Sequence, residues 1–177
     1  GGPAGAAVAI RLARAGLRVV LADADDRSRD KVGESLAPSA RLVLERVGVW
    51  EQCRAAGHRP YYANRSAWGD DRVETDSFLR DPHGHGWQID RRRFEVMLAA
   101  EAVRAGCRWL AGTSVDRLAP SGDGFRLTLA SATGRADLAA RFVIDATGRA
   151  SRVARRLGAR RVLSDRLVAL VAFLAAD

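Results

Sequence analysis

The chain has 177 residues, 47% of them hydrophobic and 28% charged, which is typical of a globular domain and excludes a disordered segment. The formal net charge of +8 comes from 29 basic residues, all but Lys31 arginines, and they are scattered rather than gathered in one block, so we expect no nucleic-acid partner. The longest apolar run, LVALVAFLAA, is about half as long as a transmembrane helix, so we expect no membrane span. The sequence shows no signal-peptide pattern, so we expect a cytoplasmic protein. Its cysteines and histidines lack the spacing of metal ligands, so we expect no bound metal.

The chain begins with a glycine-rich stretch, GGPAGAA, that leads into a helix and then a strand. Apolar side chains at helical spacing predict a helix over residues 4–15 that ends at Gly16. The run RVVLA predicts a buried strand over residues 18–22, just before Asp23. This is the order of a βαβ unit without its first strand, and the only methionine is Met97. We therefore expect a segment of a longer protein, truncated at both ends.

The middle of the chain alternates between loops and helices. The stretch KVGESLAP predicts a loop over residues 31–38, and the next residues predict a helix over 39–47 that ends at Gly48. Residues 57–79 are polar and aromatic without periodicity, which predicts irregular structure within an insert over residues 57–90. An extended piece at residues 87–89 leads into a helix over 91–105, which ends at Gly106.

Strand patterns dominate the last third. Residues 108–111 are a strand candidate, and extended pieces over 114–118, 125–130 and 136–144 are separated by the turns SGDG and SATG, as in a β-meander. The last piece continues into DATGR and a basic helix over residues 151–157. The predicted fold class is therefore α/β, with a parallel sheet and an antiparallel β-meander insert.

The glycine-rich stretch matches part of the G-x-G-x-x-G fingerprint for dinucleotide binding. Gly2 and Gly5 take the places of its second and third glycines, which let the backbone approach a pyrophosphate and the helix pack close to the sheet. The N–H groups from Ala4 onward face an anion at the positive end of the helix dipole. Asp23 is placed to accept hydrogen bonds from both hydroxyls of a ribose, and its charge disfavours NADP. A small-residue helix start without a ligand remains the alternative explanation.

Four motifs in this order extend the interpretation: GGPAGAA, KVGES, GWQIDRRRFEVMLAAEA and VIDATGR. Their combination resembles the FAD-dependent monooxygenase and flavin-dependent halogenase superfamily, which includes para-hydroxybenzoate hydroxylase, the geranylgeranyl reductases and the tryptophan halogenases. SAWG followed by DPHGHGWQIDR is similar to the flavoproteins that hydroxylate tryptophan while tryptophylquinone cofactors mature. The resemblance covers nearly the whole chain and implies a Rossmann-like FAD-binding domain of the glutathione-reductase type, with its first strand missing.

The resemblance also implies which residues bind the cofactor, FAD, although it assigns no catalytic side chain. Two of the candidates have simpler explanations: Glu34 as a solvated loop acid, and Asp90, expected to orient Arg91, as the N-cap of the following helix. The implied residues are Gly2, Pro3, Ala4 and Gly5 at the pyrophosphate, Asp23 at the adenosine ribose, Gly33, Glu34 and Ser35 near the flavin, Arg91 at the phosphates or ribityl chain, Val115 at the adenine edge, and Asp145, Ala146, Thr147 and Gly148 in a second turn beside the cofactor.

Two features of the superfamily are missing from this sequence. No Gly-Asp turn, whose acid binds the ribityl chain, follows DATGR. The halogenases use a lysine some tens of residues beyond the phosphate turn, whereas the only lysine here, Lys31, comes just before GES. Arginine does not readily replace that lysine, because its charge is fixed and delocalised. Halogenation is therefore disfavoured.

For the complete protein, the resemblance implies an FAD-dependent, NAD(P)H-driven monooxygenase that hydroxylates an aromatic or other electron-rich substrate through a flavin C4a-hydroperoxide. That substrate would be a small molecule or a peptide-borne residue. The alternatives are a flavin reductase of the geranylgeranyl type and a non-catalytic nucleotide-binding module. Residues 1–165 would form the FAD-binding domain, with 57–90 on the substrate side, and residues 166–177 would begin the substrate-domain sheet. We expect the segment to be inactive alone, and its oligomeric state is open.

Overall fold

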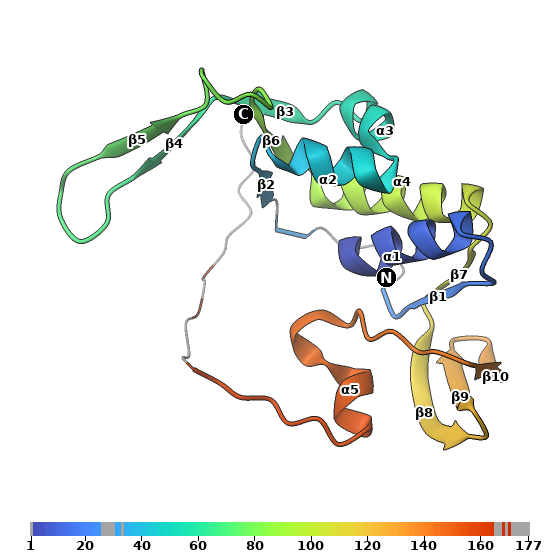
Figure 1. Cartoon of the computed structure of the whole chain (residues 1–177). Coiled ribbons are helices and arrows are strands. Elements are labelled where there is room, and N and C mark those ends of the chain that lie inside the picture. The colour runs from blue at the N-terminus through green and yellow to red at the C-terminus, as the bar shows by residue number, and fades with distance from the viewer. Residues whose placement is uncertain (1, 26–30, 33, 165–167, 169, 171–177) are drawn as a thin grey trace.

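The computed structural model describes residues 2–25, 31–32, 34–164, 168 and 170. In this part of the chain, α1 (Pro3–Arg14) and α4 (Arg91–Arg104) pack side by side, next to α2 (Ala40–Val47) and α3 (Trp50–Ala55) (Figure 1). The helices predicted over 4–15, 39–47 and 91–105 are confirmed. The glycine predicted after each of them has a positive φ, between 79° and 95°, as a helix-ending glycine requires. The short helix α3 was not predicted.

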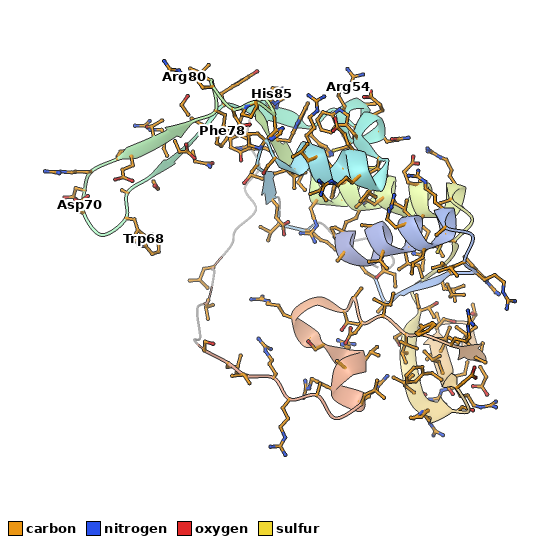
Figure 2. The ribbon with its side chains drawn as sticks, viewed as in Figure 1. Arg54, Trp68, Asp70, Phe78, Arg80 and His85 are labelled. Carbon is orange, nitrogen blue, oxygen red and sulfur yellow. The ribbon has the colours of Figure 1, made fainter. Side chains whose placement is uncertain are left out.

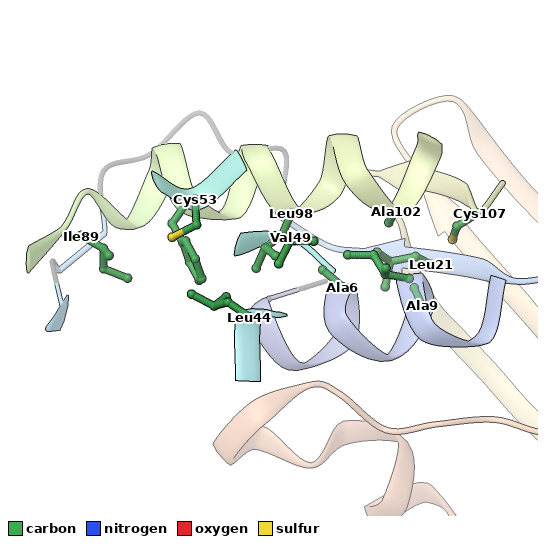
Figure 3. Packing of buried hydrophobic residues seen from close by; sticks show 12 residues of the cluster. Ala6, Ala9, Leu21, Leu44, Val49, Cys53, Ile89, Leu98, Ala102 and Cys107 are labelled. Carbon is green, nitrogen blue, oxygen red and sulfur yellow. The ribbon is translucent and has the colours of Figure 1, made fainter. Parts of the chain in front are cut away.

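The hydrophobic core lies between α1 and α4 (Figure 3). Small side chains, Ala6 and Ala9 on α1 and Ala102 on α4, are almost completely buried and let the two helices approach closely. Ile10 and Leu98 fill the remaining space, and Leu21 joins the same cluster from the neighbouring strand. This packing fixes the orientation of α1, and therefore the direction in which its first turn points.

A parallel pair of strands lies next to these helices. β1 (Val20–Asp23) pairs with β7 (Arg108–Ala111), with Asp23 opposite Ala111. Both strands were predicted from their apolar runs, over residues 18–22 and 108–111. The parallel part of the predicted fold is therefore confirmed, and it places Asp23 at the carboxyl end of β1.

The predicted β-meander is also confirmed. β8 (Ser114–Ser121), β9 (Gly124–Ser131) and β10 (Gly134–Ala140) form an antiparallel sheet in the order β10-β9-β8. The predicted turns SGDG and SATG connect these strands, with Ser121 opposite Gly124 and Ser131 opposite Gly134. The third strand ends earlier than predicted, at Ala140; beyond it Phe142 and Ile144 are exposed, and no described strand pairs with them. The helical turn η1 (Gly148–Ala150) and the short helix α5 (Arg152–Arg156) follow.

The prediction of a loop at KVGES and of irregular structure over residues 57–79 was wrong. Strand β2 (Glu34–Leu36) pairs with β6 (Gly86–Ile89), whose other edge pairs with β3 (Arg59–Tyr61). A separate hairpin consists of β4 (Ala63–Ser66) and β5 (Glu74–Ser77). Strands β2 and β3 pair with β6, which is distant in sequence, and β4 and β5 consist mostly of polar residues. Local hydrophobic periodicity therefore did not predict these strands.

Two predictions fall outside the described residues. Gly33 is one, and most of residues 166–177, the expected start of the substrate-domain sheet, are the other. Within the described residues, no helix is both long and apolar enough to cross a membrane.

Candidate functional site

The first turn of α1 presents backbone donors without helical acceptors. The first bond of the helix runs from the Ala6 N–H to the Gly2 carbonyl (3.0 Å), so the N–H groups of Ala4 and Gly5 lack an acceptor within the helix. Gly2 is the N-cap and supplies no capping side chain, and Pro3 follows as the first helical residue. This end of α1 therefore offers two donors, and the positive end of the helix dipole, to an anion.

The DATGR turn packs directly against the same turn of α1. A Cβ atom added to Gly5 would lie 3.1 Å from the Cβ of Ala146 and 3.4 Å from the Cδ1 of Leu21. The first distance is tighter than an ordinary carbon contact, so only glycine lets helix, strand and turn approach this closely without adjustment. Two predicted motifs from opposite ends of the sequence are thus brought together.

Asp145 holds the DATGR turn in shape. Its Oδ1 accepts hydrogen bonds from the backbone N–H (2.9 Å) and the hydroxyl (2.6 Å) of Thr147, and its Oδ2 accepts one from the Ala154 N–H (2.8 Å). Burial alone would raise the pKa of Asp145, but these hydrogen bonds lower it below the ordinary value of 3.8. Thr147 in turn accepts from the Arg152 N–H, and Gly148 has a φ of 64°. These groups connect the turn to α5.

An ion-pair network brings the GES and DR motifs together. Arg91 forms ion pairs with Glu34 of β2 and, through its Nε at 2.8 Å, with Glu95 one turn further along α4. The other oxygen of Glu95 pairs with Lys31 Nζ at 2.5 Å, and Lys31 also pairs with Asp25 at 2.6 Å. Glu34 is therefore an ion-pair partner and not only a solvated loop acid. Ser35 lies beside it in β2, opposite Gln88.

Glu95 is the residue of this site that sequence reasoning missed. Its side chain is only 2% exposed, and a Cβ atom added to Gly2 would lie 3.9 Å from its Oε1. The network therefore reaches the first turn of α1. The available signal was its position four residues after Arg91, which puts an acid and a base on one helical face.

Asp90 begins α4. Its side chain accepts a hydrogen bond from the Arg93 N–H at 2.9 Å, so the expected N-cap is confirmed. No hydrogen bond joins it to Arg91 among the described interactions. The ion-pair partners Glu34 and Glu95, rather than Asp90, hold Arg91.

Asp23 and Val115 lie on the sheet side of α1. Asp23 is buried; its carboxylate accepts from the Asp25 N–H at 3.2 Å, and its carbonyl accepts from the Thr113 N–H at 2.8 Å. Val115 follows on β8, where the register shifts between Val115 and Arg117. The carbonyl of Val115 accepts a hydrogen bond from Arg156 of α5. β8 thus contacts both β1 and α5.

A separate cavity of about 480 Å³ lies beside the start of α4. It contains none of the residues predicted to bind the cofactor; its lining residues are Gly57, His58, Arg59, Gln88, Ile89, Asp90 and Arg93. Burial lowers the pKa of His58, and the charge of Arg93 lowers it further. In the described ranges, no three His, Cys, Asp or Glu residues gather closely enough to hold a metal ion.

This arrangement, an uncapped helix start with a glycine-lined approach and a fixed arginine, suits a dinucleotide pyrophosphate. Residues 1–175 match a protein family described as the FAD binding domain. The chain belongs to this FAD-binding family. Its relatives are flavin-dependent halogenases and other FAD-dependent enzymes, so the predicted superfamily is confirmed.

Flavin-dependent halogenase armH3 of Armillaria mellea is 30% identical over 156 residues, which are 84% of this chain and 31% of the halogenase. LodB of Marinomonas mediterranea, named as a candidate FAD-dependent oxidoreductase, is 28% identical over 98% of this chain and 48% of its own length. A solved flavoprotein/dehydrogenase from Cytophaga hutchinsonii has a TM-score of 0.82 and 25% identity, over 93% of this chain and 42% of its own. This member of the FAD-binding family therefore spans less than half the length of each of these proteins.

Proposed function

We propose that this chain is the FAD-binding part of an NAD(P)H-driven monooxygenase that hydroxylates an aromatic or other electron-rich substrate, either a small molecule or a residue of a peptide. Its domain, residues 1–165, would be a Rossmann-like fold of the glutathione-reductase type. One observation carries the FAD-binding part of the proposal: the first turn of α1 contacts the DATGR turn at Gly5 and lies beside the Arg91–Glu95 ion pair at Gly2.

The residues at this turn fit a pyrophosphate. Among the described residues not adjacent to Gly2 in the chain, the atom nearest to where its Cβ would lie is Glu95 Oε1, at 3.9 Å, so an anion can come close to the N–H groups of Ala4 and Gly5. Pro3 fixes the first helical residue without adding a donor. Arg91, held by two carboxylates, would add a charged donor directed at the phosphates.

The remaining candidates fit the rest of a dinucleotide. Asp23 would accept hydrogen bonds from the adenosine ribose, and the register shift after Val115 leaves irregular backbone next to it for the adenine edge. Ser35, with Glu34 and Gly33, would lie near the flavin. Ala146 and Gly148 would border the cofactor, while Asp145 and Thr147 keep their turn in shape. When bound, FAD supplies electron transfer and activation of dioxygen; the protein orients it and excludes water.

Residues 57–90 would contribute to the substrate side. The β4–β5 hairpin within them projects from the rest of the molecule (Figure 1). Trp68 in its loop is 94% exposed, and Leu79 beyond β5 is also exposed. Apolar side chains exposed this far from the core are suited to cover a substrate or the following part of the protein.

Halogenation is the second candidate function, because relatives 30% identical to this chain are named as halogenases. The position of Lys31 disfavours it. The only lysine of the chain is engaged by Asp25 and buried Glu95, and its place just before GES does not match the position of the halogenase lysine. In a preparation of the whole enzyme that holds FAD, oxygen-dependent NAD(P)H consumption should require an aromatic substrate and leave the product unhalogenated when chloride or bromide is added. A halogenated product would show that the enzyme is a halogenase and not a hydroxylase. Reduction of the substrate without oxygen would show that it is a reductase.

The FAD site itself is tested by Gly2→Ala. Among the described residues, the nearest atom to this methyl group would be Glu95 Oε1, at 3.9 Å, so the protein itself can accommodate it, whereas it would obstruct a pyrophosphate that lies against the turn. We expect FAD affinity, measured by flavin fluorescence, to fall at least about tenfold while the melting temperature stays nearly unchanged. Gly16→Ala, at the other end of α1, is the control: its φ of 82° strains an alanine, so stability should fall and FAD affinity should not. Equal FAD binding by Gly2→Ala and the unmodified chain would contradict the site.

A further inference from the structure

We infer that Glu95 is a positioning residue for the dinucleotide pyrophosphate: its buried carboxylate fixes Arg91 on one oxygen and Lys31 on the other, beside the first turn of α1. The inference rests on the proposed function for its ligand. The ion-pair geometry that carries it is independent of that function.

Among the described residues, Glu95 holds two cations from different parts of the chain. Arg91 lies one turn before it on α4, whereas Lys31 follows β1 in sequence. With 2% of its side chain exposed, the Glu95 carboxylate is removed from water, and leaving such a charge without partners is strongly destabilising. Glu95 and its two cations are therefore constrained to stay together.

The hydrogen-bond pattern of Arg91 shows what this constraint achieves. Its Nε donates to Glu95 and its Nη1 donates to Glu34. Within the described part of the chain, Nη2 has no hydrogen-bond partner, so it remains available to a phosphate oxygen. A planar guanidinium held at two of its nitrogens has a fixed direction for the third.

Charge alone does not explain the network. Among the described residues, three carboxylates, of Asp25, Glu34 and Glu95, pair with these two cations, so this part of the cluster carries no net positive charge that would attract an anion. We therefore assign Glu95 an orienting contribution: it directs the Arg91 guanidinium and holds Lys31 on its other oxygen, with Oε1 lying 3.9 Å from where a Cβ of Gly2 would be. Burial alone would lower the pKa of Lys31, but its hydrogen bonds to Asp25 and Glu95 raise it, consistent with a tightly held ammonium.

Lys31 makes the inference directly measurable, because it is the only lysine of the chain. The rate at which an amine-reactive acylating reagent modifies Lys31, followed by peptide mass spectrometry, reports how firmly the network holds the ammonium. Glu95→Gln keeps the side-chain shape and removes the charge. We expect it to raise this rate about three- to tenfold, since one unit of pKa changes the free amine tenfold, and to weaken FAD binding about tenfold.

Glu101→Gln is a matched control. Glu101 is also buried on α4, 4% exposed, and pairs with an arginine of the same helix, Arg104. Its substitution should cost comparable stability yet leave Lys31 reactivity and FAD affinity unchanged. If Glu95→Gln proves too unstable to titrate, Lys31→Met, at a side chain 31% exposed, should stay folded and weaken FAD binding about threefold.

Unchanged Lys31 reactivity in Glu95→Gln, or FAD affinity equal to or tighter than that of the unmodified chain, would overturn the positioning role. Changes of the same size in Glu101→Gln would also overturn it, because they would reflect general destabilisation. Failure of the unmodified chain to bind FAD would overturn the proposed function, while the Lys31 rate still decides whether Glu95 fixes the cations.

Discussion

The α1–α4 core and the β4–β5 hairpin are stabilised by different interactions. Ala6 and Ala9 of α1 are almost completely removed from solvent against α4 (Figure 3), and Ile10 of the same cluster has no exposed surface. In the hairpin, every residue of β5 is exposed, and Trp68 and Asp70 lie in its loop, away from the other elements (Figure 2). The core is stabilised by burial of apolar side chains, whereas the hairpin is held by backbone pairing between β4 and β5.

This difference separates the two proposed tasks of the chain. A cofactor turn must be held in a fixed place, and the proposed one lies at the start of α1, which packs against α4 in the hydrophobic core. The β4–β5 hairpin, if it contacts the substrate as proposed, does not need to be buried in this domain. Substitutions in the two regions should therefore differ strongly in their effect on stability.

The largest expected effect is in the core. Ile10→Ala removes three carbons from a side chain with no exposed surface and leaves a cavity between α1 and α4, so the free energy of unfolding should fall by about 3–4 kcal/mol. Urea denaturation followed by circular dichroism measures it. Leu17→Ala, just after α1 and half exposed, is the control and should change the free energy by no more than about 0.5 kcal/mol. Equal losses at both positions would contradict the core assignment.

An intermediate effect is expected where the DATGR turn meets the core. Asp145→Asn loses the charge that accepts three hydrogen bonds and turns one amide group toward an N–H, so stability at pH 7 should fall by about 1–2 kcal/mol. Because folding lowers the pKa of Asp145 below 3.8, its contribution is present above about pH 4 and is lost as the pH falls through the folded-state pKa.

Urea titrations of both proteins at several pH values test this prediction. The difference between Asp145→Asn and the unmodified chain should be constant near neutral pH and shrink as the pH falls below 3.8 through the lowered folded-state pKa of Asp145. A difference that stayed the same at acid pH would show that the charge of Asp145 does not stabilise the turn.

The same contrast explains how much of the fold could be predicted from sequence. The core helices and the parallel strands carry apolar residues at regular spacing, and glycines with positive φ end the helices, so local patterns identified them. Strands β2, β3, β4 and β5 are short and mostly exposed, and their order comes from pairing with distant or polar partners. Local patterns contain no information of that kind.

The candidate site shows the same limit. Gly2, Gly5 and Arg91 belong to recognisable motifs and were predicted, but the contact of Gly5 with Ala146 appears only in three dimensions. Glu95 lies inside a helix in which an acid is usually solvated. Its burial follows from the packing of α4 against the start of α1, which the spacing of residues along α4 does not determine.

The smallest expected effect is in the hairpin. Trp68→Ser removes a large side chain that is 94% exposed, so the free energy of unfolding should change by less than about 0.5 kcal/mol, measured by urea denaturation. FAD affinity should also stay unchanged, because the hairpin contributes none of the residues at the start of α1.

If Trp68 serves the substrate side, replacing it with serine should raise the KM for an aromatic substrate in an active preparation of the whole enzyme, without changing kcat for NAD(P)H consumption. Tyr62→Phe, which keeps the ring of another exposed aromatic residue, should change neither value. A loss of more than about 1 kcal/mol on replacing Trp68 would mean that the loop packs on this domain, and the proposed division between cofactor core and substrate hairpin would then fail.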